Sequence, residues 1–363
     1  SPAFIDAPPT LRPDWDGALL RAIDEALALE PGADPLGPCR GMLAALHDAQ
    51  ATVEFAEDGA WAPVRLEWVD GRALVTHADA DAGLRIGDRI LKVDGVEAGA
   101  WVERAMSRAP GARDDVRERV GLALGMLGPH GSTIEVRASR RGGSGEEDVR
   151  LTRRFKSTTA GDVRDVAPGV LYVDPSTFTD ESFIEALRGP LSEADAVIVD
   201  YRSLGMGGLH RHLGSFIAGG APVMTRLVPT PLYPNREEMA LTNMEALLTP
   251  NHPHIAAKLI VLADAGTRSD PELDVMFVKR FKLGTIVGER TAGAAGPPAV
   301  YEFDDMGRRI VATWTAAGTT LDGTTAHFTR GVEPDVEVRP TAAGLGAGRD
   351  EALEEAIRIA KAR

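Results

Sequence analysis

Cysteine is nearly missing from the 363-residue sequence, in which Cys39 is the single one. One thiol excludes an internal disulfide and any metal site built from several cysteines, but it leaves the redox compartment of the protein open. Long apolar runs are missing as well, because the longest stretches, around Leu259 and Val197, end after a handful of residues. We therefore expect no membrane-spanning helix.

Positive charge is also in short supply. The chain has 40 Lys and Arg against 54 Asp and Glu, which gives a formal net charge of −14 at pH 7. This balance disfavours a phosphate backbone as partner, although residues 137–141 and 153–154 are locally basic. Nucleic acid is therefore not an expected partner.

Apolar residues make up 44% of the sequence, which is enough for a substantial core. A globular protein of two or three domains is expected at this length. The chain begins at Ser1-Pro2 without a methionine or the apolar core of a signal peptide, which is compatible with an export signal having been removed.

The first sixty residues have the apolar spacing of helices. Leucine and isoleucine recur at helical intervals after residues 14–16, and Met42, Leu43 and Leu46 repeat the pattern. The spacing predicts two short helices in an N-terminal helical segment, residues 1–60.

The period of the apolar pattern shortens after this segment. Residues 64–68 and 73–75 alternate on either side of Asp70-Gly71, which predicts a β-hairpin. The further elements expected are turns at 87–88 and 94–95, a strand at 90–93, a helical run at 101–127, a strand at 133–137 and a Gly-rich gap at 142–147.

The stretch "AGLRIGDRILKVDGVE", residues 82–97, resembles the signature segment of PDZ domains. The resemblance implies a PDZ-like domain over residues 63–155, which would accept an extended peptide beside an exposed strand. The sequence shows no clear glycine loop for the terminal carboxylate of such a peptide. A module that only packs against its neighbour therefore remains the alternative.

Beyond Gly169 the pattern changes to strands that alternate with helices. Continuous apolar strands separated by helices predict a parallel sheet covered on both faces, with the active site beyond the carboxyl ends of the strands. Two segments, residues 200–208 and 264–272, follow such ends. The predicted strands are 170–173, 196–200, 259–263 and 285–288, and the predicted helices are 181–188, 209–217 and 271–281.

Four segments of this half resemble the carboxyl-terminal processing (tail-specific) serine peptidases and their relatives, tricorn protease and interphotoreceptor retinoid-binding protein. In chain order the segments are "VIVDYRSLGMGG", "GTRSDPE", "GTIVGERTAGAAG" and "TRGVEPDVEV". The resemblance implies a ClpP/crotonase-like α/β core over residues 165–363, with the PDZ-like domain inserted in it or preceding it.

The mechanism that the resemblance implies is acyl transfer from a serine. Ser269 lies at the position of the family's nucleophile, and the amides of Gly207, Gly208 and Asp270 are the candidates for the oxyanion hole. The alternative for Ser269 is a helix N-cap, because Ser-Asp-Pro-Glu is favourable helix-start chemistry. The alternative for the two glycines is a flexible loop.

The sequence departs from the family at the general base. Ala294 stands where the processing peptidases have a lysine, and Gln50 stands where the tricorn-like members have a histidine. The supporting acidic residue expected shortly before "GVEPD" is also missing, since residues 326–330 read "AHFTR". Neither alanine nor glutamine can accept the proton of a serine.

Three histidines are substitute candidates for the base. His210 follows the glycine loop, His327 lies near the position of the family's orienting carboxylate, and His47 lies three residues before Gln50. We favour His210 and His327, while a surface or capping role is the alternative for each of the three. No pair has the spacing of a helical zinc motif, and neither a metal nor a cofactor is expected.

Two functions follow from the sequence. The first is a serine peptidase or related acyl hydrolase that acts on a polypeptide or a peptide C-terminus through Ser269 and a non-standard base. The second is a catalytically inactive relative that binds a peptide tail or an apolar small molecule in the same cleft. The resemblance implies a periplasmic or secreted protein, the sequence leaves a cytoplasmic location open, and nothing in it marks the oligomeric state.

Overall fold

The structure is a computed structural model that describes most of the chain between residues 14 and 362. Inside this range, the residues outside the description are 144, 156–161, 178–185, 187–188, 203–212, 218, 220–222, 232–238, 251, 253, 306, 317 and 320–327. None of the helices in the described ranges has the length and apolar character of a membrane span.

The N-terminal segment, residues 14–59, contains the two predicted helices. They are α1 (Trp15–Leu27), which the Asp14 carboxylate caps by accepting from the Gly17 N–H, and α2 (Gly37–Ala44). A short strand, β1 (Thr52–Phe55), follows them. Val53 and Phe55 of this strand pack with Leu43 and Leu46 in a small apolar cluster.

The next unit, residues 60–155, is here called the β module. Its antiparallel sheet has the strand order β3-β4-β5-β8-β9, and the apolar side chains of the strands form a core of their own. The elements are β2 (Ala60–Trp61), β3 (Val64–Val69), β4 (Arg72–Ala78), β5 (Arg89–Val93), β6 (Val96–Glu97), α3 (Ala98–Ser107), α4 (Asp114–Gly125), β7 (Leu127–Gly128), β8 (Thr133–Ser139) and β9 (Glu146–Thr152).

The single helical run predicted over residues 101–127 is wrong, because two helices occupy this range. The chain breaks between α3 and α4 at Pro110-Gly111, where proline lacks an N–H donor and Gly111 has a φ of 144°. The break lets α3 and α4 pack against each other. The assignment of this module as PDZ-like stays a prediction.

The predicted parallel α/β core is confirmed. Its sheet has the order β10-β11-β12-β15-β16-β20, and every neighbouring pair is parallel except β10 with β11. The elements of the core are β10 (Asp162–Ala167), β11 (Val170–Asp174), β12 (Ala196–Asp200), β15 (Lys258–Ala263), β16 (Gly284–Gly288), β20 (Val336–Glu337), α6 (Pro190–Glu193), α8 (Ser269–Phe281), α9 (Ala342–Gly346) and α10 (Glu351–Lys361). Most of the predicted helices 181–188 and 209–217 lies outside the described residues.

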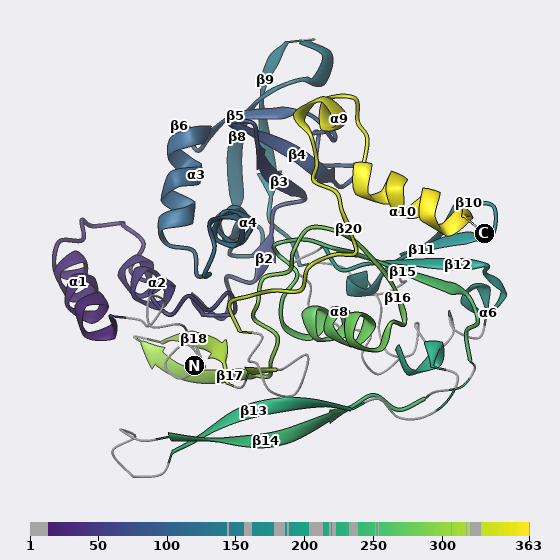
Figure 1. The fold of residues 1–363 in the computed structure, drawn as a ribbon. Coiled ribbons are helices and arrows are strands. Elements are labelled where there is room, and N and C mark those ends of the chain that lie inside the picture. Colours follow the sequence, from purple (N-terminus) through teal and green to yellow (C-terminus); the bar gives the residue numbers. More distant parts are fainter. Residues whose placement is uncertain are drawn as a thin grey trace.

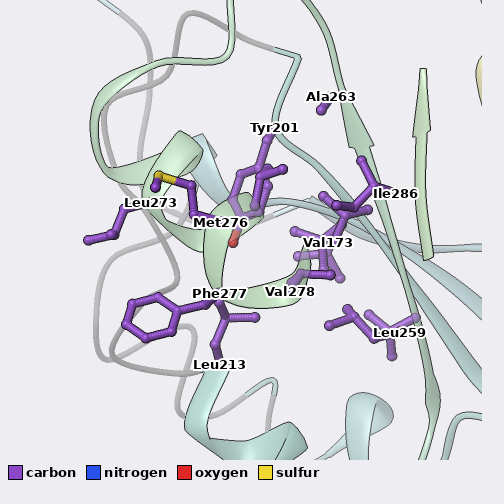
Figure 2. Close-up of a cluster of buried hydrophobic side chains, with 14 of the residues drawn as sticks. Val173, Tyr201, Leu213, Leu259, Ala263, Leu273, Met276, Phe277, Val278 and Ile286 are labelled. Atoms are coloured by element: carbon purple, nitrogen blue, oxygen red, sulfur yellow. The ribbon is translucent and has the colours of Figure 1, made fainter. Parts of the chain in front are cut away.

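Helices cover both faces of this sheet, as the continuous apolar strands require. One face packs against α8, and Figure 2 shows Val173 and Leu259 of the strands in the same cluster as Met276 of that helix. The other face packs against α10 (Figure 1), and there Ile198 of β12 and Ile260 of β15 cluster with Ala352 and Ala356 of that helix. The period-2 alternation of strands therefore fills both layers.

Two hairpins that the sequence did not predict extend from the core. The strands β17 (Pro298–Asp305) and β18 (Arg308–Thr315) form a sheet with β1, in which Thr52 lies opposite Thr313. The strands β13 (Val223–Pro231) and β14 (Met239–Leu247) form a second sheet with β19 (Gly318–Thr319). Strand β1 thus binds the N-terminal segment to the C-terminal half of the chain, which brings residues 48–50 to the core (Figure 1).

The β module also contacts the core through the turn at Gly87-Asp88. Gly87 has a φ of +88°, and a Cβ at this position would lie 2.0 Å from the Leu345 carbonyl oxygen in α9. Glycine is therefore required at this turn by its conformation and by the close approach of α9.

Replacing this glycine tests the contact. We expect Gly87→Ala to lower the free energy of unfolding by more than Gly71→Ala, measured by urea denaturation. Gly71 has a φ of +71° but open space around it, so its alanine variant incurs only the left-handed penalty of about 1–2 kcal/mol. Equal losses in the two variants would show that α9 does not press against the turn.

Candidate active site

Ser269 lies at the turn between β15 and α8, at the carboxyl end of the parallel strands. Asp264 builds this turn, because its carboxylate accepts from the Gly266 N–H at 2.8 Å. The Thr267 hydroxyl donates to the Tyr201 carbonyl at 2.9 Å and accepts from the Asp264 N–H at 3.0 Å. The turn is thereby fixed to the end of β12, the neighbouring strand of the sheet.

The backbone of Ser269 is strained. Its φ is +60°, the left-handed region that costs a residue with a side chain about 1–2 kcal/mol. Its N–H donates to the Ala294 carbonyl at 3.2 Å, which holds this conformation. Arg268 occupies the cap position of α8 and makes no capping bond, so Ser269 is the first helical residue rather than the N-cap. Strain of this kind is concentrated at functional sites.

Gln50 lies against the same loop that holds Ser269. Its side-chain amide donates to the carbonyl oxygens of Ala294 and, at 3.2 Å, Gly296, and to the Thr315 hydroxyl at 3.0 Å. The Ala294 carbonyl therefore accepts from both Gln50 and the Ser269 backbone. The side chain of residue 50 and the backbone of the candidate nucleophile are therefore connected through this one carbonyl oxygen.

Asp48 fixes the backbone of Gln50 and the residue that Gln50 contacts, Thr315. Its buried carboxylate accepts from the Thr315 N–H at 2.8 Å, from the Thr315 hydroxyl at 2.7 Å and from the Gln50 N–H at 3.1 Å. Asp48, Gln50 and Ser269 thus follow one another as the acid, base and nucleophile of a catalytic triad would, but the middle side chain is an amide. Gln50 can orient neighbours and cannot take a proton.

Ala294 is fully buried in an apolar cluster. The cluster joins the loops around Ser269 to Val116 and Val120 of α4 and to Ala49 of the N-terminal segment. A lysine at position 294 would have to bury its chain among these side chains or displace α4. The small side chain of Ala294 therefore allows α4 of the β module to pack closely against this loop.

Glu272 was not recognised from the sequence, although it fixes the loop that faces Ser269. Its fully buried carboxylate accepts from the Thr291 hydroxyl, from the Gly293 N–H at 2.7 Å and from the Ala294 N–H at 2.7 Å. The one available signal was its spacing of three residues from Ser269, which is typical of a capping box. Here the carboxylate contacts the neighbouring loop instead of the helix start.

Arg268 places a cation beside Ser269. Burial lowers the pKa of its guanidinium to about 10, while the charges of Asp48 and Glu54 oppose that change. The group is still protonated at neutral pH, so it cannot serve as a base there. Its buried Nη1 has no hydrogen-bond partner among the described residues.

The other predicted site residues are placed as follows. Asp270 is the second residue of α8 and is half-buried. His47 has a φ of +54° and a buried Nδ1 without a hydrogen-bond partner, and no hydrogen bond joins it to Ser269 within the described ranges. The predicted residues that lie outside the described part of the chain are Gly207, Gly208, His210 and His327. No cluster of three potential metal ligands occurs among the described residues.

A buried charge cluster joins the β module to the turn before Ser269. Arg119 of α4 pairs with Glu67 of β3, with Asp264 at 3.4 Å and with Glu289 at 2.8 Å. One guanidinium thus faces three carboxylates. Burial raises the pKa of Glu289 to about 7, with Arg119 opposing the shift and the neighbouring acids adding to it. Burial also raises the pKa of Asp264.

The known proteins that are similar to this chain include one peptidase family and several solved structures. Residues 169–338 match the family model of peptidase family S41. No curated protein sequence matches the chain. The structure of mature CPAF complexed with lactacystin aligns with 98% of this chain and 94% of its own, with a TM-score of 0.68 and 16% identity. A structure from Parabacteroides merdae, described as a peptidase, aligns with 96% of this chain and 89% of its own, with a TM-score of 0.51 and 15% identity.

The photosystem II D1 C-terminal processing protease is also similar, with 20% identity, 93% coverage of each chain and a TM-score of 0.49. The parallel sheet and the likeness to CPAF show that the two proteins share an α/β fold. The match of residues 169–338 to the model of peptidase family S41 confirms the resemblance to the carboxyl-terminal processing peptidases.

The cluster around Arg119 predicts a pH dependence of stability. The pKa of Glu289 is raised in the folded state from 4.5 to about 7, so the folded protein binds a proton that the unfolded chain has released. Stability should fall as pH rises from about 5 to about 7. Glu289→Gln should reduce this fall by on the order of 2 kcal/mol, because each pKa unit corresponds to about 1.4 kcal/mol.

Urea denaturation at pH 5 and pH 8 measures the effect. Glu302→Gln in β17, an exposed carboxylate, is the control and should leave the pH dependence unchanged. Burial also raises the pKa of Glu118 to about 7, so some pH dependence should persist in Glu289→Gln. The same fall in wild type and Glu289→Gln would contradict the prediction.

Proposed function

We propose that this protein is a serine peptidase of the C-terminal processing type that works with a non-standard general base. In this proposal the Ser269 hydroxyl attacks a peptide carbonyl and a polypeptide or peptide C-terminus is the substrate. The observation that carries the proposal is the strained Ser269 backbone at the start of α8, at the carboxyl end of the sheet. Such strain is retained where a nucleophile must project from a tight strand-to-helix turn.

The start of α8 suits the charge that develops in acyl transfer. The first amides of a helix point outward and favour an anion, and the Asp270 N–H belongs to this first turn. Together with Gly207 and Gly208 it forms the proposed oxyanion hole. The proton of Ser269 is assigned to His210 or His327, with His47 as the third candidate. The family resemblance extends the proposal to a periplasmic or secreted location.

A second function is favoured by Gln50 and Ala294. Gln50, whose amide donates to the Ala294 and Gly296 carbonyls, stands at the sequence position where the tricorn-like relatives have a histidine. Ala294 is buried against side chains of α4. If neither His210 nor His327 reaches Ser269, the cleft binds a peptide tail or an apolar small molecule without cleaving it. The two functions differ in one property, the nucleophilicity of Ser269.

A fluorophosphonate probe tests this property directly. We expect the wild-type protein to be labelled and Ser269→Ala not to be, because only an activated serine attacks the phosphorus. Ser107→Ala, a change at an exposed serine of α3, should keep the labelling. A folded wild-type sample that remains unlabelled from pH 6 to pH 9 would exclude the peptidase and leave the binding function.

Introducing an imidazole at position 50 tests the geometry around Ser269. We expect Gln50→His to raise the rate of labelling by at least about tenfold, since a positioned general base contributes about 10²–10⁴. Gln50→Leu removes the same hydrogen bonds without supplying a base and is the matched control. Equal rates in the two variants would show that position 50 does not face the hydroxyl.

A further inference from the structure

A cavity of about 370 Å³ separates the N-terminal segment from the β module, and its lining includes neither Ser269 nor Gln50. One wall comes from residues 34–58, including β1, and the other from the facing sides of α3 and α4 and the following strand. The β-bridge between Gly59 and Gly128 joins the two walls at one end. The volume falls within the range of about 300–1,000 Å³ that is typical of small-ligand sites.

The wall of the N-terminal segment has a net negative charge, because it holds the carboxylates of Asp34, Glu54 and Asp58 and one cation, Arg40, which pairs with Asp34. The side chain of Glu54, in the middle of β1, has no hydrogen bond or ion pair in the described part of the chain. Burial raises its pKa, while the charges of Arg40 and Arg268 oppose the shift. Asp58 has a buried Oδ1 without a hydrogen-bond partner, and its closest cation, Arg308, is 3.9 Å away. Burial raises the pKa of Asp58 as well. Two carboxylates are therefore partly desolvated without a direct hydrogen-bonding partner.

The wall of the β module is basic. Arg104 projects from α3 and has no ion pair or side-chain hydrogen bond among the described residues. Arg153 donates to the Met126 and Thr133 carbonyls and to the Ser132 hydroxyl, but no carboxylate contacts it. Burial accordingly lowers the pKa of Arg153, while the charges of Asp94 and, to a smaller extent, Asp58 oppose the shift.

The two charged walls face each other across the cavity with little direct ion pairing between them. The single ion pair that crosses between them within the described residues joins Arg108 to Asp34 at 3.9 Å. Inside, Glu54 and Asp58 do not reach Arg104 or Arg153. Opposite charges held apart in a partly desolvated cavity keep an unfavourable desolvation energy that direct contact would offset. An occupant with a charge of each sign would complete both walls.

The remainder of the lining is apolar. The Trp101 ring packs close to Gly125, where an added Cβ would lie 2.6 Å from the ring, and Leu124 and Leu127 lie beside them. This surface fits the body of a ligand rather than its charged ends. The cavity therefore combines an acidic wall, a basic wall and an apolar patch.

We propose that this cavity binds a zwitterionic small ligand with an apolar side chain, a free amino acid or a dipeptide. The ammonium group of the ligand lies against Glu54 and Asp58, and its carboxylate lies against Arg104 and Arg153. The side chain packs on Trp101. The inference does not depend on the proposed peptidase function, because none of the proposed catalytic or oxyanion-hole residues lines the cavity, although the charge of Glu54 acts on Arg268.

Binding of leucyl-leucine to the full chain tests the proposal by thermal shift and isothermal titration calorimetry. We expect the free dipeptide to raise the melting temperature by a few degrees at saturating concentration. The N-acetylated dipeptide and the C-terminal amide should each bind at least about tenfold more weakly, because each lacks one charge-assisted contact. Ser269→Ala should bind the free dipeptide as the wild type does.

Variants of the two walls locate the site. Glu54→Gln and Arg104→Met should each weaken binding at least about tenfold. The controls are Glu103→Gln on the exposed side of α3 and Arg72→Met in β4, which should leave the affinity unchanged. The proposal is overturned by equal binding of the free and blocked dipeptides, by the absence of binding, or by unchanged affinity in folded Glu54→Gln and Arg104→Met. It is also overturned if Ser269→Ala abolishes binding, because the ligand would then occupy the serine cleft.

Discussion

The hydrogen bonds of the Glu272 carboxylate are the constraint on which the site depends. They fix the loop of residues 291–294 against α8, and the position of the Ala294 carbonyl follows from them. That carbonyl in turn receives the Ser269 N–H and the Gln50 side chain. One buried carboxylate therefore determines where the serine, the loop and the N-terminal segment meet. A buried charge is tolerated here because its oxygens accept several strong hydrogen bonds.

The β module takes part in the same arrangement. Val116 and Val120 of α4 belong to the apolar cluster around Ala294. Arg119 of the same helix forms an ion pair with the Asp264 carboxylate in the turn before Ser269. Arg113 adds hydrogen bonds to the Thr291 carbonyl at 3.0 Å and the Arg330 carbonyl at 3.1 Å. The loops around Ser269 are thus held by contacts from three separate parts of the chain, so a substitution in any of these parts can change the site.

Local patterns in the sequence were sufficient for the parallel sheet and for the turn that carries Ser269. Continuous apolar runs mark buried parallel strands, and the turn follows one of them directly. The sheet of β1, β18 and β17 could not be predicted, because Thr52 and Thr313 are far apart in sequence and no local pattern specifies their pairing. The roles of Asp48 and Glu272 were missed for the same reason, because each carboxylate accepts hydrogen bonds from residues that are distant in the sequence. The break between α3 and α4 was readable at Pro110-Gly111.

The pairing of β1 with β18 has a consequence for folding. During synthesis β1 leaves the ribosome well before its partner β18 is made. Until then β1 is an unpaired strand edge, and such edges are prone to associate with other chains. Glu54 places a charge in the middle of this strand, which opposes that association. The N-terminal segment can therefore become native only after β18 has been made, so a chain that lacks the hairpin of β17 and β18 would leave β1 exposed.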